Sequence, residues 1–352
     1  YYKKIKSLIK FQKDGKIELD LSYFSYYLHD QLHLYSDKFV KEFGAPRQKN
    51  DAYQEKHRQI AAALQKVVEE ILAQCLNHLH DITKLDKVVV AGGVFMNSVF
   101  NGKILTKTKF KDVFITSSPD DSGTSIGAAL HVYHEKAKHA KRFVMDENYF
   151  GPEFSDAEIK KALDNYRIKY QKMDKIEAYA AKKIAEGKLI GWFQGKMEFG
   201  QRSLGNRSIL CDPRDGSMKD KVNLAVKYRE SFRPFAPSVL EERAEEYFEI
   251  EKNMRVPFME KVCMIRKEKQ KVIPAVTHVD GSGRLQTVSK RTNPRYHRLI
   301  SEFRKITGVP VLLNTSFNLN GEPIVCTPTD AIRTFYSCGL DMLVIGDYVV
   351  KK

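Results

Sequence analysis

Six of the cationic side chains between residues 191 and 237 lie in loops or at the ends of expected strands. They are Lys196, Arg202, Arg207, Lys227, Arg229 and Arg233. Glycines at 195, 200 and 205 stand beside them, and glycine lets backbone N–H groups approach phosphate oxygens. Guanidinium groups add paired hydrogen bonds to phosphate or carboxylate. The pattern indicates either a pocket for a multiply charged anion or an ordinary basic surface.

Short polar side chains follow an apolar run near the C-terminus. Residues 309–313 predict a buried strand, and Asn314, Ser316 and Asn318 come directly after it. In mixed α/β domains, ligands are usually held where strands end. These three side chains are therefore candidates for contacts with a ligand.

Two strand-to-helix junctions in the first half of the chain carry further candidates. The strand expected from residue 87 runs into Gly92, Gly93 and then Asn97, an arrangement in which backbone amides and a helix N-terminus meet phosphate or ribose. Any tight turn also favours glycine. After the strand expected at 112–116, either Asp120 and Asp121 bind a cation that bridges nucleotide phosphates, or Asp121 and Ser122 cap the following helix.

Length and composition limit the classes of protein. At 352 residues the chain is expected to form two domains. It has no run of 18 apolar residues and no signal sequence at its N-terminus, so we expect a soluble, cytoplasmic protein without a membrane partner. The net charge of +15 indicates attraction to polyanions or to small anions. RNA binding is one hypothesis, and a general lysine-rich surface is the alternative.

The cysteines and two of the histidines are interpreted as structural residues and not as disulfide or metal-binding residues. The five cysteines are at positions 75, 211, 263, 326 and 338. They form no C-x-x-C pair and are odd in number, so we expect them to be reduced and buried. His29 and His33 have the spacing of ligands on one helix face. Because no third ligand or carboxylate is nearby, we interpret them as structural.

The apolar periodicity predicts an α/β protein. Helices are expected at 53–80, 124–134, 155–166, 175–186, 241–248, 294–306 and 329–338. Strands are expected at 87–91, 112–116, 189–193, 208–211, 261–265, 309–313 and 342–350, with two short strands around a turn within 274–288. The sequence Tyr-Phe-Gly-Pro at 149–152 predicts a domain boundary.

Six ordered sequence strings together resemble the O-carbamoyltransferase family of nodulation-factor and antibiotic biosynthesis. They are AGGVFMNSVFNGKI, SSPDDSGTSIGAAL, GWFQGKMEFGQRSLGNRSIL, NLAVKYRESFRPFAPS, THVDGSGRLQTV and VLLNTSFNLNGEPIVCTP. The resemblance covers nearly the whole chain. It implies the rear part of an actin-like, sugar-kinase-like ATPase-fold carbamoyl-transfer domain in residues 1–145. It also implies an α/β domain similar to threonylcarbamoyl-adenylate synthases, which forms carbamoyl adenylate, in residues 150–352.

The resemblance implies a two-step reaction. Carbamoyl phosphate and ATP, with Mg²⁺, would give carbamoyl adenylate, and the carbamoyl group would then pass to a hydroxyl of a small-molecule acceptor. By analogy, Arg202, Lys227, Arg233 and Arg284 are catalytic and bind the phosphates of carbamoyl phosphate and the adenylate. The implied substrate and nucleotide contacts are Lys196, Arg229, Asn314, Ser316, Asn318, Gly92, Gly93 and Asn97.

The same resemblance implies a metal and a further segment. Asp121 would bind a divalent metal such as Fe²⁺ in the transfer domain. The family begins with a nucleotide-binding lobe that carries an H-x-x-x-H metal motif, and this chain starts downstream of it. We therefore expect either a fragment or a separate chain that supplies the lobe. A non-catalytic subunit and an RNA-binding module related to tRNA modification are the alternative hypotheses.

Overall fold

The computed structural model describes residues 1–12, 15–30, 32–138, 141–230 and 232–352. By packing, the chain divides into two compact units. Unit 1 comprises residues 1–89 and 103–114, and unit 2 comprises residues 90–102 and 115–352. The boundary predicted near residue 150 does not coincide with this division, because residues 90–102 and 115–150 pack within unit 2. As a boundary between family domains it stays a prediction.

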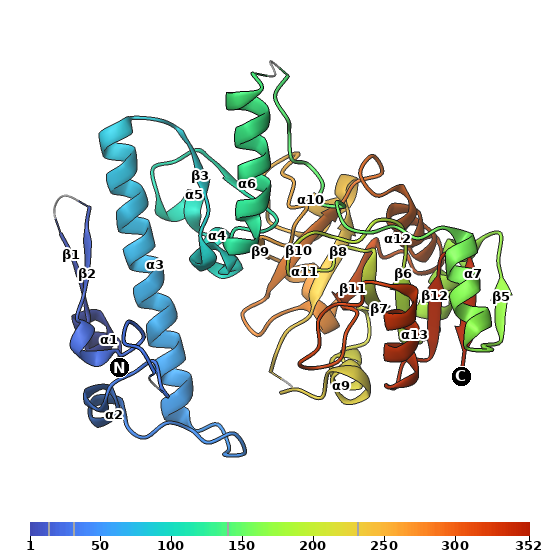
Figure 1. The fold of residues 1–352 in the computed structure, drawn as a ribbon, viewed down its shortest axis with the longest axis horizontal. Helices are drawn as coiled ribbons and strands as arrows, with labels where there is room; N and C mark the ends of the chain where they lie inside the picture. The colour runs from blue at the N-terminus through green and yellow to red at the C-terminus, as the bar shows by residue number, and fades with distance from the viewer. Residues whose placement is uncertain (13–14, 31, 139–140, 231) are drawn as a thin grey trace. The chain divides into compact units, whose positions relative to one another are not determined.

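Unit 1 is built around one long helix (Figure 1). Its elements are α1 (Tyr2–Ser7), β1 (Ile9–Phe11), β2 (Ile17–Leu19), η1 (Leu21–Tyr23), α2 (Asp37–Phe43), α3 (Glu55–Thr83), β3 (Lys87–Val90), α5 (Ile104–Lys107) and β4 (Asp112–Ile115). β1 pairs with β2, and β3 pairs with β4. The apolar periodicity of 53–80 thus predicted α3 to within a few residues. Ala63 and Val67 on one face of α3 pack with Ile5 and Phe43 in a small core.

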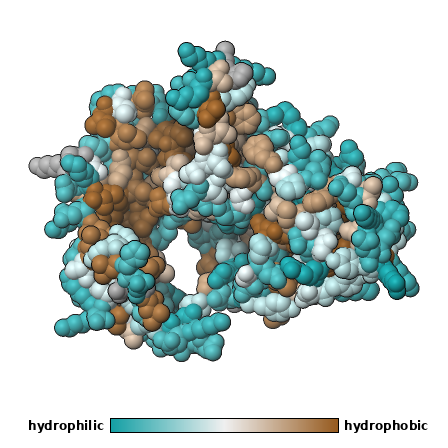
Figure 2. Space-filling model, viewed as in Figure 1, coloured by the Kyte–Doolittle hydropathy of each residue, from teal (hydrophilic) through white to brown (hydrophobic). Residues whose placement is uncertain are grey.

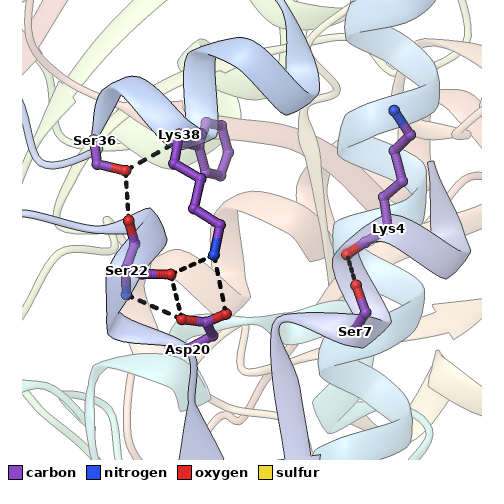
Figure 3. A network of polar contacts seen from close by, with 7 residues as sticks. Lys4, Ser7, Asp20, Ser22, Ser36 and Lys38 are labelled. Atoms are coloured by element: carbon purple, nitrogen blue, oxygen red, sulfur yellow. Dashed lines mark hydrogen bonds and ion pairs between the residues drawn. The ribbon is translucent and has the colours of Figure 1, made fainter.

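Polar contacts hold the start of α2 against the segment that precedes it (Figure 3). The Asp20 carboxylate accepts hydrogen bonds from the backbone and the hydroxyl of Ser22 at 3.1 and 2.5 Å. The Lys38 ammonium reaches Asp20 at 3.5 Å, and the Ser36 hydroxyl donates to the Ser22 carbonyl at 2.8 Å. The helix expected to carry both His29 and His33 is absent from the described residues of this segment, and His33 instead stacks on Tyr35.

Apolar surface gathers over the part of unit 1 that holds α3 (Figure 2). Leu64, Leu79 and Ile82 of this helix are exposed. Within the described residues, no helix is long and apolar enough to cross a membrane. Cys211 and Cys338 are buried as expected, whereas the other three cysteines are partly exposed.

Unit 2 contains a mixed sheet with the strand order β5-β13-β12-β6-β7-β11-β8-β10-β9. The strands are β5 (Tyr170–Lys172), β6 (Ile190–Phe193), β7 (Arg207–Cys211), β8 (Ala236–Leu240), β9 (Lys261–Met264), β10 (Ser282–Val288), β11 (Val311–Ser316), β12 (Met342–Ile345) and β13 (Tyr348–Lys351). The pairs β10–β8 and β12–β6 are parallel, and β11 runs antiparallel to both β7 and β8. The protein is therefore a mixed α/β structure, as predicted.

Unit 2 also contains helices, some of which begin at capping residues. They are η2 (Gly93–Met96), α4 (Ser98–Asn101), η3 (Asp121–Gly123), α6 (Thr124–His131), η4 (Val132–Lys136), α7 (Asp156–Asn165), α8 (Ile176–Ala185), α9 (Met218–Val222), η5 (Asn223–Lys227), η6 (Glu241–Arg243), α10 (Ala244–Tyr247), α11 (Lys267–Gln270), η7 (Pro274–Val276), α12 (Pro294–Thr307) and α13 (Pro328–Tyr336). Ser155 and Thr327 form capping boxes at α7 and α13, which satisfy the first free N–H groups. α8 and α12 pack together, and α13 packs on β6 and β12.

Two sequence predictions in unit 2 are wrong in detail. Residues 274–288 form a 3-10 turn followed by one strand, β10, which pairs with β9 instead of folding back on itself. The strand expected at 309–313 extends as β11 to Ser316, because Asn314 and Thr315 continue the pairing with β7. Asn314 and Ser316 therefore lie within a strand, with side chains fixed by the sheet.

Candidate active site

A cavity of about 440 Å³ lies in unit 2, beside β8, β9, β10 and β11. Its lining residues are Ser98, Val99, Gln201, Arg202, Ser203, Arg229, Arg233, Pro234, Phe235, Ala236, Met259, Val262, His278, Arg284, Asn314, Thr315 and Ser316. Four of these residues are arginines, and no Asp or Glu is among them. A volume of this size is ordinary for a small-molecule site. The excess of positive charge favours an anion.

Among the described residues, the Arg284 guanidinium makes no ion pair with a carboxylate, although it lines the cavity. It lies on β10, where its backbone pairs with Val262 of β9. Its Nε atom is buried and has no hydrogen-bond partner among the described residues. Burial lowers the pKa of Arg284 to about 9, and repulsion by Arg202 and Arg229 acts in the same direction. The guanidinium is still charged at neutral pH, and an anion in the cavity would relieve its desolvation.

Arg202 joins the cavity to the segment that follows β3. Its Nη2 atom donates a hydrogen bond to the carbonyl oxygen of Met96 at 3.3 Å, and burial lowers its pKa. Gln201 donates to the Asp120 carboxylate and, at 3.2 Å, to the Ser122 hydroxyl. These contacts hold the loop at 201–202 on two segments distant in the sequence.

Arg229 and Arg233 occupy another part of the cavity lining. The Arg229 guanidinium donates to the Asn223 side chain at 3.1 Å and lies 4.6 Å from the centre of the Phe235 ring. Burial lowers the pKa of Arg229, and repulsion by Arg233 adds to the effect. Arg233 pairs with Glu230 at 2.8 Å, and its side chain is about half exposed. Arg233 thus already has a counter-ion that Arg284 lacks.

Lys227 does not line the cavity but braces one of its walls. Four oxygens surround its Nζ atom: the Ser316 carbonyl at 2.6 Å and hydroxyl at 3.2 Å, and the Asn318 carbonyl at 3.0 Å and side chain at 2.7 Å. Burial lowers the pKa of Lys227 to about 7, and the Arg229 charge contributes. Because an ammonium has three donors, protein acceptors saturate it. Its first effect is to fix Ser316.

Asn314 forms the polar floor of the site. Its Nδ2 atom lies 3.2 Å from the Ser203 carbonyl, 3.1 Å from the Ser238 hydroxyl and 3.0 Å from Oε1 of Gln286. The residue is 1% exposed. Its Oδ1 atom is buried and has no hydrogen-bond partner among the described residues. This oxygen is an unused acceptor at the edge of an anion cavity.

The loop that carries Arg202 is held by a buried acid. Oε1 of Glu198 accepts backbone hydrogen bonds from Leu204 at 2.6 Å, Asn206 at 2.8 Å and Arg207 at 3.2 Å. Burial raises the pKa of Glu198. The Gly205 N–H donates to the Ser208 hydroxyl. The Gly205 N–H is therefore not free for a phosphate, since an internal acceptor takes it.

Three of the six cations expected in one pocket do not line it: Lys227, described above, Arg207 and Lys196. Arg207 is fully buried, donates to the carbonyls of Gln194 and Pro152, and stacks on Phe193. It stabilises the start of β7. Lys196 lines a second cavity of unit 2, of about 460 Å³. The structure thus does not bring Lys196 to the arginine cavity.

The Gly-Gly junction lies beside the cavity without lining it. The Gly92 N–H donates to the Pro119 carbonyl at 2.6 Å, so it is not free for a ligand. Asn97 caps α4 by accepting from Phe100 N–H at 3.2 Å, and the next residues, Ser98 and Val99, reach the cavity. Gly93 has open space where a side chain would begin.

Among the described residues, Asp121, the expected metal ligand, belongs to no group of three potential metal-binding side chains. Within the described residues, no three His, Cys, Asp or Glu side chains come together in a way that could hold a metal ion. The alternative that Asp121 caps the helix is also wrong, because α6 begins after Gly123 and has no side-chain cap. It is Asp120 that binds Ser122 and Gln201. The described residues thus do not form a metal site by themselves, and we derive no step through a metal.

Sequence reasoning overlooked several residues of the cavity wall. Gln201 directly precedes Arg202, and His278 lies in the string THVDGSGRLQTV, in which only Arg284 has an expected role. A third signal is Gly102, where a Cβ atom would stand 2.0 Å from the Val262 carbonyl oxygen. Only glycine allows the end of α4 to approach β9 so closely. That contact places Ser98 and Val99 next to the cavity.

Comparison with known proteins identifies the class. The family model described as Carbamoyltransferase N-terminus matches residues 3–130, and the model described as Carbamoyltransferase C-terminus matches residues 181–352. Together they cover most of the chain, on either side of the boundary predicted near 150. The chain belongs to the carbamoyltransferase family.

Three relatives show what the chain resembles. Nodulation protein NolNO of Sinorhizobium fredii is 45% identical over 310 residues, which are 87% of this chain and 46% of that protein. Nodulation protein NolO of Bradyrhizobium diazoefficiens is 44% identical, over 87% of this chain and 57% of its own length. The 3'-hydroxymethylcephem-O-carbamoyltransferase of Streptomyces clavuligerus is 31% identical, over 82% of this chain and 53% of its own. The chain spans about half the length of these relatives.

Proposed function

We propose that unit 2 forms carbamoyl adenylate from carbamoyl phosphate and ATP, and that the carbamoyl group then passes to a hydroxyl of a small-molecule acceptor. One observation carries the first step: four arginines and no carboxylate line one cavity. Both substrates and both leaving groups are phosphates. Fixed cations stabilise the negative charge that develops on a leaving phosphate.

Each of the four arginines is given a role in phosphate binding that follows from its contacts with other protein residues. Arg284 and Arg202, which make no ion pair with a described carboxylate, are free to bind the leaving phosphates. Arg229 is held between Asn223 and Phe235 and presents its remaining donors to a phosphate. Arg233 is half exposed and exchanges its contact with Glu230 for a phosphate on binding. Magnesium enters bound to the phosphates of ATP, which hold it with few protein ligands.

Lys227 acts mainly through the residues it holds. Its bonds to Ser316 and Asn318 join the end of η5 to the end of β11. The Ser316 hydroxyl and the unused Oδ1 of Asn314 are then fixed on the cavity wall. We assign these two groups, with Asn318, to recognition of the carbamoyl group or the nucleotide.

The transfer step rests on the family and on the names of relatives. The Streptomyces relative is named for carbamoyl transfer to the oxygen of a hydroxymethyl group, which supports a hydroxyl acceptor. We propose that residues 1–145 form the rear part of an actin-like ATPase fold, in which Gly93 and Asn97 contact the nucleotide. The Fe²⁺ at Asp121 and a separate chain that supplies the first lobe stay predictions.

An RNA-binding role is the less favoured explanation of the net charge of +15. Nucleic-acid surfaces spread their cations along the outside, where they meet successive phosphates. Here four arginines converge on a cavity of about 440 Å³. That arrangement suits one small anion better than a polymer.

Pyrophosphate release tests the proposal. The purified chain is mixed with ATP and magnesium, with and without carbamoyl phosphate, and pyrophosphate is measured with a coupled assay. The proposal predicts release that requires carbamoyl phosphate and needs no acceptor. If a folded protein releases no pyrophosphate under either condition, the assignment of this cavity is wrong.

A further inference from the structure

His278 lines the arginine cavity and has one ring nitrogen without a partner. It follows η7 and begins a tight turn, in which its own N–H donates to the Ser282 carbonyl at 2.8 Å and the Gly281 N–H donates to the His278 carbonyl at 3.0 Å. The ring Nδ1 lies 3.0 Å from the Ser282 hydroxyl. The ring Nε2 is buried, with no hydrogen-bond partner among the described residues.

The neighbours of His278 define which nitrogen carries the proton. The Ser282 hydroxyl donates its single hydrogen to the Asp280 carboxylate at 2.6 Å, so it accepts from Nδ1–H of His278. Burial acts to raise the pKa of Asp280, but the hydrogen bonds from Ser282 outweigh it and the pKa is lowered. A charged Asp280 can only accept a hydrogen bond, so it determines which group is the donor in each hydrogen bond between Asp280, Ser282 and His278. In the neutral ring, Nε2 therefore holds a lone pair.

Several charges act on this ring. Burial is the largest influence and lowers the pKa of His278; Asp280 opposes it, whereas Arg284 and Lys219 lower the pKa further. The lowered pKa favours the neutral ring, which can accept a proton. Because the turn is already closed by backbone bonds, its geometry does not depend on the imidazole alone.

The proposed reaction needs such an acceptor. When carbamoyl phosphate and ATP give carbamoyl adenylate, phosphate and pyrophosphate, two bonds to phosphate break and only one forms, so one water is consumed. Water adds to the carbamoyl carbon, the bond from that carbon to the phosphate oxygen breaks, and phosphate leaves with the electron pair. One water proton stays on the phosphate and the other is released. Carbamate then attacks the α-phosphorus of ATP and displaces pyrophosphate, a step that releases no proton.

We propose that Nε2 of His278 accepts the proton of the water that cleaves carbamoyl phosphate, with Ser282 and Asp280 as positioning residues. This inference rests on the proposed function. It makes His278 the general base of the first half-reaction only, because the second half-reaction has no proton to remove. The two half-reactions therefore respond differently to the loss of the imidazole.

Supplying carbamate directly separates the two half-reactions. Ammonium bicarbonate solutions contain carbamate, so pyrophosphate release is measured once with carbamoyl phosphate and once with ammonium bicarbonate, each with ATP and magnesium. The variants are His278→Gln, which keeps hydrogen bonding but cannot act as the base, and Ser282→Ala, which removes the anchor of Nδ1. His29→Gln, at an exposed histidine of unit 1, is the matched control.

We expect the variants to lose pyrophosphate release with carbamoyl phosphate and to keep it with carbamate. His278→Gln should lower release with carbamoyl phosphate by about 10²–10⁴-fold and leave release with carbamate unchanged, while Ser282→Ala shows a smaller loss of the same kind. The wild-type rate with carbamoyl phosphate should fall as the pH falls through a pKa below the ordinary value of histidine, and His278→Gln should lack this limb. The control variant should behave as the wild type.

Other results overturn the inference. Equal losses with both substrates would make His278 a structural or binding residue, and no loss with carbamoyl phosphate would remove it from the reaction. A wild-type protein that uses carbamate but not carbamoyl phosphate would contradict the inference and leave adenylate formation standing. If the wild type uses neither, the proposed function itself fails. Thermal unfolding of each variant shows whether the fold is kept, and Ser282→Ala decides the question if His278→Gln does not fold.

Discussion

The ammonium of Lys227 lies 2.6 Å from the carbonyl oxygen of Ser316 and 3.2 Å from its hydroxyl. These residues are 89 positions apart in the sequence, and the pair links the end of η5 to the end of β11. No acidic side chain is among the four oxygens that surround Nζ. Lys227 thus braces this wall through neutral partners, which explains how it contributes to the site without lining the cavity.

Replacing Lys227 with Met should destabilise the protein as well as inactivate it. The change leaves the Ser316 and Asn318 oxygens without their donor, and each buried group that loses its hydrogen bond costs about 1–3 kcal/mol. The free energy of unfolding, measured by urea titration, should fall by that order. Pyrophosphate release should fall even where the folded fraction is complete. An unchanged free energy of unfolding would show that the four contacts of Lys227 do not stabilise the fold.

Arg284→Met should abolish pyrophosphate release while it keeps or raises stability. The wild-type guanidinium is buried without a counter-ion, so an apolar side chain of similar length removes a desolvation cost. Binding of inorganic pyrophosphate, measured by calorimetry, should weaken as well. Arg304→Met, on the exposed side of α12, is the control for the loss of one positive charge. Similar pyrophosphate affinities in the two variants would contradict the assigned role of Arg284.

Glu198→Ala should unfold the loop that carries Arg202. Three backbone N–H groups lose the acceptor Oε1, and the expected loss of unfolding free energy is about 2–5 kcal/mol. Glu198→Gln keeps one acceptor oxygen and should lose less. Thermal unfolding checks both variants. A Gln variant as unstable as the Ala variant would mean that the charge, and not the hydrogen bonding, holds the loop.

Glu260 should make stability depend on pH. Burial raises the pKa of Glu260 to about 7, above the value of about 4.3 for an unfolded chain. A raised carboxyl pKa stabilises the fold below the unfolded pKa, and this stabilisation is lost as the pH rises to the folded pKa. The unfolding free energy of the wild type should therefore fall, relative to Glu260→Gln, between about pH 4.3 and pH 7. A constant difference over this range would show that Glu260 titrates normally.

The sequence patterns predicted elements better than they predicted the site. Long apolar periodicities located α3, α8 and α12, because burial of one helix face leaves a regular mark in the sequence. Of the cation cluster, Arg202, Arg229 and Arg233 line one cavity, and its occupation by an anion stays a prediction. Adding Arg284 required the family resemblance, since nothing in the spacing relates a residue of β10 to the loop at 202.

What the patterns did not predict are contacts between distant segments. Lys196 and Arg207 have the same local setting as Arg202, yet one lines another cavity and the other is buried against backbone carbonyls. The Ser208 hydroxyl accepts the N–H of Gly205, one of the glycines that the pattern had assigned to a phosphate. The partner of each polar group depends on which strands become neighbours, and that is decided by the packing of the whole sheet.

The most direct test of the central claim is the identity of the nucleotide product. The chain is incubated with ATP, magnesium and carbamoyl phosphate, and the nucleotides are separated by ion-pair chromatography. Formation of carbamoyl adenylate in the arginine cavity predicts carbamoyl adenylate itself, or AMP from its breakdown, in amounts equal to the pyrophosphate released. ADP as the sole product, or AMP formed equally well without carbamoyl phosphate, would contradict it.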